Sequence, residues 1–258
     1  MSSNRQQIAD FWDQHVDAWL AGDDPMPDPL PSWYSCYAGK GVGASTREGF
    51  PEPYIGDLRG VQQAPRMVVL GLNPGAYRRS FQSRDGIFAK QIASLGSFSA
   101  WSRSGPYHGG EWDAEMGPNR FHRARVGFAR NWLNDPAVDW SGLLVMELYP
   151  WHSTSVTASM TPPSGVIDTF VWQPLADLDV PDVFAFGRPW QALALSLGLR
   201  QTDSLGAGGR CYGSGVESRA VRTFDLPSGQ RLVVEWHSGS AGPPSAAETA
   251  LLRQALTQ

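Results

Sequence analysis

The fold is decided by the stretch Met67-Val-Val-Leu-Gly-Leu-Asn-Pro-Gly75. Its aliphatic half predicts a buried β-strand, and the Gly, Asn and Pro residues that close it predict a tight turn. In open α/β sheets ligands bind just beyond the carboxyl ends of the strands, so Asn73 is expected at a binding edge. The alternative is a plain turn without a chemical role.

Further strands and helices are expected on both sides of this stretch. A mostly parallel sheet with helices on both faces follows from strands separated by helical segments, so we predict a three-layer α/β/α fold with a central, mostly parallel four-stranded sheet. The expected strands are 143–148, 182–186 and 231–236, with 220–226 forming a hairpin to the last, and the expected helices are 4–21, 119–133, 188–197 and 245–256.

Two long segments lack a clear periodic pattern. Residues 22–66 are interrupted by prolines and are predicted to form an ordered wrapping loop, because they also hold several aromatic residues. Residues 76–118 are expected to be irregular, with one short helix at 84–95. In the helix at 119–133, Asn119 is the expected N-cap and Phe121 is expected on the buried side.

Composition bounds the class of protein. The 258 residues suffice for one large α/β domain. No run approaches the roughly 18 apolar residues of a membrane span, and the N-terminus does not resemble a signal peptide, so a cytoplasmic protein without a membrane partner is expected. Cys36 and Cys211 cannot form a four-thiolate cluster, and no Cys or His pair has zinc-finger spacing, so we expect no metal, cofactor or disulfide.

Charge is distributed unevenly along the chain. The formal net charge is -4, yet residues 71–130 hold nine Lys or Arg against four Asp or Glu, which gives +5 and leaves -9 for the rest. The net acidity argues weakly against a protein that coats nucleic acid, but this basic segment includes the turn at Asn73 and so places positive charge beside it. An ordinary solvated surface is the alternative.

Polar residues follow each expected strand. They are Asn73 after the first, Glu147, Tyr149 and Trp151 to Ser153 around the second, Arg188 after the third, and His237-Ser238-Gly239-Ser240 after the fourth. Because the carboxyl ends of parallel strands meet at one edge, these residues form one candidate site.

Four short motifs of the chain, two of them at these strand ends, resemble motifs of the uracil-DNA glycosylase superfamily. Gly71-Leu72-Asn73-Pro74-Gly75 is similar to its first motif in the mismatch-specific and single-strand-selective branches, and His237-Ser238-Gly239-Ser240 to its last. Asp85-Gly86-Ile87-Phe88 resembles the element whose aromatic ring stacks on the flipped base, and Asn119-Arg120-Phe121 the start of the next helix. The resemblance implies one domain over 1–258, with 1–66 as an N-terminal helix and wrapping loop and 67–258 as the catalytic core.

The resemblance also implies roles for individual residues. Asn73 would hold the attacking water, and His237 would donate a hydrogen bond to the base oxygen as it becomes anionic. The expected base-binding residues are Leu72, Tyr77, Phe88, Glu147 and Tyr149, and the expected DNA-binding residues are Arg78, Arg79, Arg84, Arg188, Ser238, Gly239 and Ser240.

Two positions depart from the family pattern. Ser238 replaces the usual Pro, and Glu147 stands where the single-strand-selective branch has the Asn that reads uracil. An ionised carboxylate only accepts hydrogen bonds, so it favours an amino group such as N4 of cytosine, and a protonated Glu147 would suit cytosine or a 5-modified cytosine. The alternative is that Glu147 pairs with a nearby Arg and another residue reads the base.

The expected function is therefore that of a monofunctional, monomeric DNA glycosylase acting on a uracil-like or modified pyrimidine, in repair or in defence against modified phage DNA. A lyase step would need a desolvated lysine in the pocket, and the chain has only Lys40 and Lys90. Two alternatives remain open: a protein that binds DNA or a modified base without cutting, and a hydrolase of free nucleosides.

Overall fold

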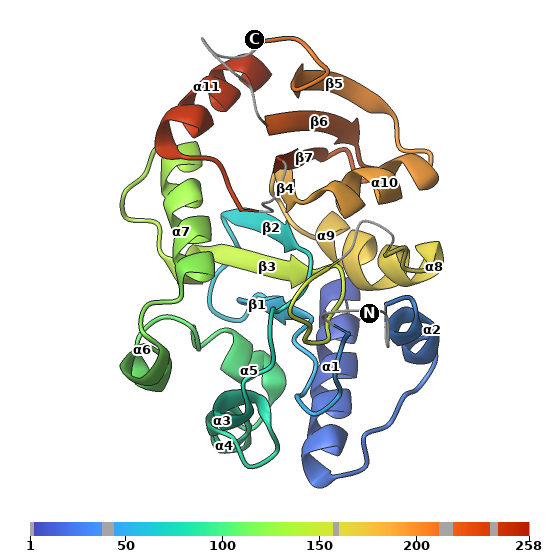
Figure 1. The fold of residues 1–258 in the computed structure, drawn as a ribbon, viewed down its shortest axis with the longest axis vertical. Helices are drawn as coiled ribbons and strands as arrows, with labels where there is room; N and C mark the ends of the chain where they lie inside the picture. The colour runs from blue at the N-terminus through green and yellow to red at the C-terminus, as the bar shows by residue number, and fades with distance from the viewer. Residues whose placement is uncertain (1–2, 38–43, 157–159, 212–218, 238–241, 258) are drawn as a thin grey trace.

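A seven-stranded mixed sheet forms the centre of the protein (Figure 1). We describe a computed structural model over residues 3–37, 44–156, 160–211, 219–237 and 242–257. The strand order is β1-β3-β2-β4-β7-β6-β5. The strands are β1 (Tyr54–Ile55), β2 (Met67–Gly71), β3 (Leu143–Glu147), β4 (Asp182–Phe186), β5 (Gln201–Gly206), β6 (Arg219–Asp225) and β7 (Arg231–His237).

The expected α/β class is confirmed, but the expectation of a mostly parallel, four-stranded sheet is wrong, since the sheet is mixed and has seven strands. Strands β3, β2, β4 and β7 form a parallel block, and antiparallel β1 on one side and β6 and β5 on the other extend it to seven. The predicted β6–β7 hairpin is confirmed by its register. Strand β5 has the sequence Gln-Thr-Asp-Ser-Leu-Gly, which lacks the alternation of apolar residues that reveals a half-buried strand.

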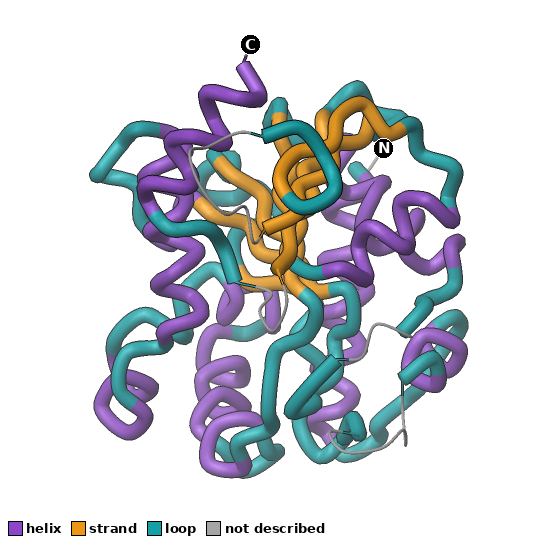
Figure 2. Tube along the Cα trace, turned by 45° about the horizontal axis from the view of Figure 1, so that its top comes forward, coloured by secondary structure: helices purple, strands orange, loops and turns teal. Residues whose placement is uncertain are grey.

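Helices cover both faces of the sheet (Figure 2). Alternate residues of β2 point to opposite faces: Val68 and Leu70 pack in one apolar cluster, and Met67 and Val69 in the other. Helices α7 (Arg120–Leu133) and α11 (Ala246–Thr257) cover the second cluster, and α1 (Asn4–Ala21), α9 (Gln173–Ala176) and α10 (Arg188–Ser196) cover the first. Burial on both faces explains why β2 reads as a continuous apolar run.

The expected helices are largely confirmed, as is the Asn119 cap. Ser3 caps α1 through a capping box with Gln6, and Asn119 caps α7. The wrapping loop is ordered in its described part and contains α2 (Leu30–Ser35), from which the Trp33 indole N–H donates to the Leu148 carbonyl (2.9 Å). Before β4 lie α8 (Ser164–Ile167) and a π-type helix, Asp168–Trp172, and a 3₁₀ helix, Trp140–Gly142, precedes β3.

Residues 76–118 form more helix than the sequence predicted. Besides α4 (Ile87–Leu95) they contain α3 (Arg79–Gln82), α5 (Phe98–Ser102) and α6 (Gly110–Met116). Buried aromatic side chains from α3 to α6 pack on one another, so tertiary contacts rather than local sequence signals hold these short helices. Within the described part of the chain, no helix combines the length and apolar character required to cross a membrane.

Candidate functional site

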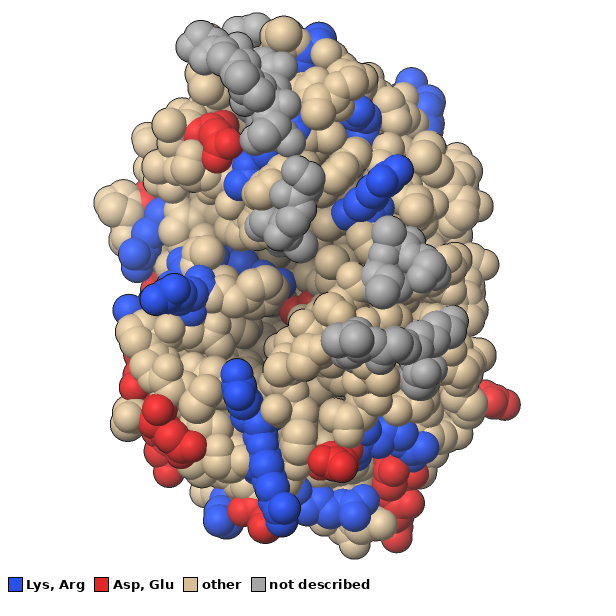
Figure 3. Space-filling view, in the orientation of Figure 1, with Lys and Arg blue, Asp and Glu red and all other residues tan. Residues whose placement is uncertain are grey.

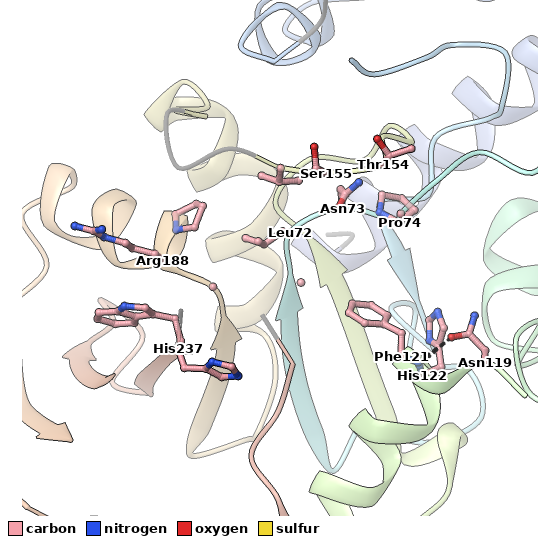
Figure 4. A pocket seen from close by; sticks show the side chains of 16 residues that line it. Leu72, Asn73, Pro74, Asn119, Phe121, His122, Thr154, Ser155, Arg188 and His237 are labelled. Atoms are coloured by element: carbon pink, nitrogen blue, oxygen red, sulfur yellow. Dashed lines mark hydrogen bonds between the residues drawn. The ribbon is translucent and has the colours of Figure 1, made fainter. Parts of the chain in front are cut away.

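A pocket of about 840 Å³ lies at the carboxyl ends of the parallel strands (Figure 4). Its walls come from the turn after β2, the segment after β3, the start of α7, the start of α10 and the end of β7. The lining residues are Gly71, Leu72, Asn73, Pro74, Gly75, Asn119, Phe121, His122, Thr154, Ser155, Val156, Gly187, Arg188, Pro189, Trp236 and His237.

Asn73 is held in one orientation by Ser153. Its Nδ2 donates to the Ser153 carbonyl (2.8 Å) and to Ser153 Oγ (2.9 Å), and Ser153 Oγ donates onward to the Ser155 carbonyl (3.0 Å). Because a carbonyl can only accept, the amide nitrogen must face Ser153, which leaves Oδ1 as an acceptor for a bound molecule. In the part of the chain that the structure describes, no donor reaches Oδ1.

His237 lies across the pocket from Asn73. It is the last residue of β7, half-buried, and belongs to a different wall from Asn73 and Phe121 (Figure 4). The two residues that the sequence predicted as catalytic, Asn73 and His237, therefore line the same pocket. The three residues Ser238, Gly239 and Ser240 lie outside the described residues.

Leu72 and Arg188 also line this pocket. Leu72 packs against Gly187, where a Cβ would lie 2.8 Å from Leu72 Cδ1, and Gly187 has φ +119°, so a glycine is needed there for two reasons. Arg188 is exposed, and its side chain extends away from Asn73 (Figure 4).

Two expected base-binding residues lie in the core instead. Phe88 in α4 is fully buried, with Trp112 stacked on its ring and Trp101 tilted against it, so its ring is not open to a base. Tyr149 is also fully buried, and its hydroxyl is hydrogen-bonded to the Tyr34 carbonyl (2.9 Å) and Ser45 Oγ (2.8 Å). We therefore reject the expected base contacts of Phe88 and Tyr149.

Tyr77 lies beside the pocket rather than in its lining. It is half-buried, its ring centroid is 6.3 Å from that of the buried His152, and desolvation raises the pKa of its phenol. Its hydroxyl is therefore neutral near pH 7.

Glu147 pairs with an arginine, as in the alternative left open above. Its Oε1 accepts from Nη1 (3.3 Å) and Nη2 (3.4 Å) of Arg125, and both side chains are buried, with 6% and 1% exposure. Burial raises the pKa of Glu147 to about 7, against the opposing effect of Arg125. Glu147 is not among the lining residues, but its Oε2 lies against Gly71, which is one of them, so the expected contact of Glu147 with the base edge stays a prediction.

Sequence reasoning missed Phe121, which was expected on the buried side of its helix. It is 39% exposed, lines the pocket, and follows the N-cap Asn119, whose Oδ1 accepts from the Phe121 amide (3.1 Å). Its neighbour His122 stacks flat on Tyr107 (4.5 Å, 8°), and burial lowers the pKa of His122 well below its ordinary value, so this imidazole is neutral.

The expected DNA-binding arginines outside the pocket are exposed. Arg78 and Arg79 lie at the start of α3, and Arg84 donates from Nε to the Trp19 carbonyl (2.8 Å) with its guanidinium over the Trp19 ring. Arg84 is thus tied to α1. Figure 3 shows a hollow on the face that carries the carboxyl ends of β2 and β3, with basic side chains at its rim and an acidic side chain inside it.

Among the described residues, no group of three or more His, Cys, Asp and Glu side chains is placed to hold a metal ion. Comparisons with protein-family models, with curated proteins and with solved structures found no match.

Proposed function

We propose that this protein is a DNA glycosylase that hydrolyses the N-glycosidic bond of a flipped, uracil-like or modified pyrimidine. One observation carries the proposal: the Asn73 amide is locked by Ser153 so that Oδ1 is left as an acceptor, and His237 stands on the opposite wall of the same pocket. These two side chains match the two tasks of glycosidic hydrolysis, which are to hold water at the sugar and to stabilise the leaving base.

The reaction can be written with these two groups. As the bond between C1′ and the base nitrogen breaks, its electron pair goes to the base and positive charge builds on the sugar. Water held by Asn73 Oδ1 then adds to C1′, and its proton is lost to the released base or to solvent. A hydrogen bond from His237 to the base oxygen would stabilise the developing anion, an effect that is typically worth about 3–4 kcal/mol.

DNA as the partner is supported by charge. The segment 71–130 carries +5 although the chain is acidic overall, and the exposed Arg78 and Arg79 follow directly after the Asn73 turn. Arginine binds phosphate through two parallel hydrogen bonds, so this segment suits a DNA backbone beside the pocket. We propose that the protein acts as a monomer, with a pocket lined by residues of one chain.

The activity is tested with short DNA strands, single and paired, that carry uracil, cytosine or a 5-substituted cytosine at one position. Abasic sites are detected by alkaline cleavage, and released bases by mass analysis. We expect the wild type to release at least one of these bases. The rate of release should fall about 100-fold or more in Asn73→Ala, because the attacking water loses the group that holds it and a misplacement of about 1 Å already costs about 100-fold. His237→Ala is expected to lose about 100- to 1000-fold.

Asn131→Ala is the matched control, since Asn131 is exposed on α7 outside the pocket. Equal release by Asn73→Ala and the wild type would overturn the assignment of Asn73. Salt-sensitive DNA binding without abasic sites would identify a binding protein instead, and release from free nucleosides alone would identify a nucleoside hydrolase.

A further inference from the structure

Phe121 presents one face of its ring to the pocket. It is the second residue of α7, and the backbone there is fixed by Asn119 Oδ1, which accepts from the amides of Phe121 (3.1 Å) and His122 (3.2 Å). The side chain is 39% exposed and reaches from the start of the helix into the pocket (Figure 4). An exposed aromatic ring in a pocket is a candidate contact for a flat ligand.

The other face of the ring is covered by Arg125. The guanidinium carbon lies 3.6 Å from the ring centroid, which is a close cation–π contact between residues one helical turn apart. Arg125 is in turn held from the sheet by Glu147, the last residue of β3. Carboxylate, guanidinium and ring thus form a stack that leads from the sheet to the pocket.

Gly71 leaves the room that this stack requires. A Cβ at this position would lie 2.2 Å from Glu147 Oε2 and 2.3 Å from Arg125 Nη2, far inside any allowed contact. The ring edge is also restrained, since Phe121 meets His122 edge to face (5.8 Å, 88°). Because Arg125 occupies the face of the ring that points away from the pocket, the Phe121 side chain cannot turn into the core, and its other face stays open toward the pocket.

We propose that Phe121 is the platform on which the flipped base stacks, and that Arg125, held by Glu147, is a positioning residue that supports this platform from below. The inference rests on the proposed function and adds the element that binds the base ring. Base stacking on an aromatic side chain is tolerant of base identity, because every base has a flat π face. The ring would therefore bind the pyrimidine while other groups select it.

Other aromatic residues fit the role less well. His122 also lines the pocket, but Tyr107 stacks on its flat face. Trp236 is the remaining rival, with Arg222 5.4 Å from its ring centroid. The test therefore compares Phe121→Leu directly with Trp236→Leu, so that the two aromatic walls are distinguished.

The experiment measures affinity without cleavage. In the Asn73→Ala background, two strands are compared that differ only at one position, which carries either uracil or a base-free abasic analogue; the strand with a 5-substituted cytosine is run in parallel. We expect Phe121→Leu to reduce the affinity for a base-bearing strand about 5- to 150-fold and to leave the abasic strand unchanged. Phe121→Trp should retain most of the preference, whereas Met116→Ala, exposed and outside the pocket, should have no effect.

The role of Arg125 is tested by a double-mutant cycle. Arg125→Met should lower the preference for base-bearing strands in the Asn73→Ala background but have little further effect once Phe121→Leu is also present. A merely structural Arg125 would weaken binding of both strands equally. Because Phe121 is exposed, Phe121→Leu is expected to fold even if Arg125→Met does not, so the platform remains testable.

The outcomes separate this inference from the proposed function. The platform is refuted if Phe121→Leu binds both strands as before, or if Trp236→Leu alone removes the preference for the base. The proposed function fails separately if the wild-type protein releases no base from any strand, a result that leaves the binding comparison intact.

Discussion

Gly71→Ala is the substitution for which the structure gives the sharpest expectation. The new methyl group would lie 2.2 Å from Glu147 Oε2, and since ordinary contacts begin near 3.4 Å, the carboxylate or the backbone must move by about 1.2 Å. Both Glu147 and Arg125 are buried and paired, so neither side chain can move without disturbing the pair. Overpacking a core costs about 1–3 kcal/mol, and separating a buried ion pair costs about 3–5 kcal/mol. We expect a loss of about 3 kcal/mol in the free energy of unfolding, since the pair is displaced rather than removed.

Urea unfolding monitored by tryptophan fluorescence measures this loss, and Gly127→Ala is the matched control. Gly127 lies within α7, the helix of Arg125, and a Cβ there would meet nothing within 4 Å. Alanine is favoured over glycine inside a helix by about 0.5–1 kcal/mol, so this control should be slightly more stable than the wild type. If Gly71→Ala unfolds at the wild-type urea concentration, or if both variants lose equal stability, the close approach at Gly71 is not what the structure indicates.

Three further predictions concern separate parts of the molecule. Ser153→Ala removes one of the two acceptors of Asn73 Nδ2 and should lower the rate of base release about fivefold, much less than Asn73→Ala, when both are measured in single-turnover assays. Arg78→Ala combined with Arg79→Ala should reduce the slope of log K against log salt for single-strand binding by about 1.4 if each residue contacts one phosphate, and an unchanged slope would remove them from the interface. Burial lowers the pKa of His15 from 6.5 to about 4, because the folded protein favours the neutral imidazole. Its contribution to stability is therefore fully present above pH 6.5 and is lost as the pH falls from 6.5 through about 4, by about 3 kcal/mol in total. His15→Phe should flatten this part of the pH–stability curve.

The sequence predicted the parts of the fold that carry strong local signals. The run Met67–Gly71 could be assigned because both of its faces are apolar and a Gly-Asn-Pro turn ends it, and α7 could be assigned from its Asn119 cap. Strand β5 could not, because it is polar and its pairing with β6 depends on contacts far away in the chain. The carboxyl ends of parallel strands meet by topology, which is why Asn73 and His237 were placed in one pocket correctly.

The errors at the site have a common physical origin. Phe88 fits the expected motif, but the helices formed by residues 76–118 take its ring into the core, and no local pattern shows how such a segment folds back on itself. Phe121 fits an apolar helical spacing, yet it lies in the first turn of α7, where the helix begins beside the pocket rather than over the sheet. The only signal that could have revealed it is Arg125 four residues later, since a charged residue on an apolar face needs a partner.

Glu147, which stands where the single-strand-selective branch has an Asn, and Arg125 depend on each other as a buried pair. A carboxylate at the end of β3 would be costly to bury alone, and a guanidinium inside α7 would be costly as well; together, at 3.3 Å, each offsets part of the penalty of the other. The pair fits only because position 71, opposite Glu147 in the register of β2 and β3, has no side chain. Gly71, the first glycine of the Gly-Leu-Asn-Pro-Gly turn, therefore leaves room for the Glu147–Arg125 pair that supports Phe121. In the proposed reaction, Asn73 of the same turn holds the water that attacks the sugar. On this reasoning, a substitution at Gly71 should weaken binding of the base and leave the orientation of Asn73, which is set by Ser153, intact.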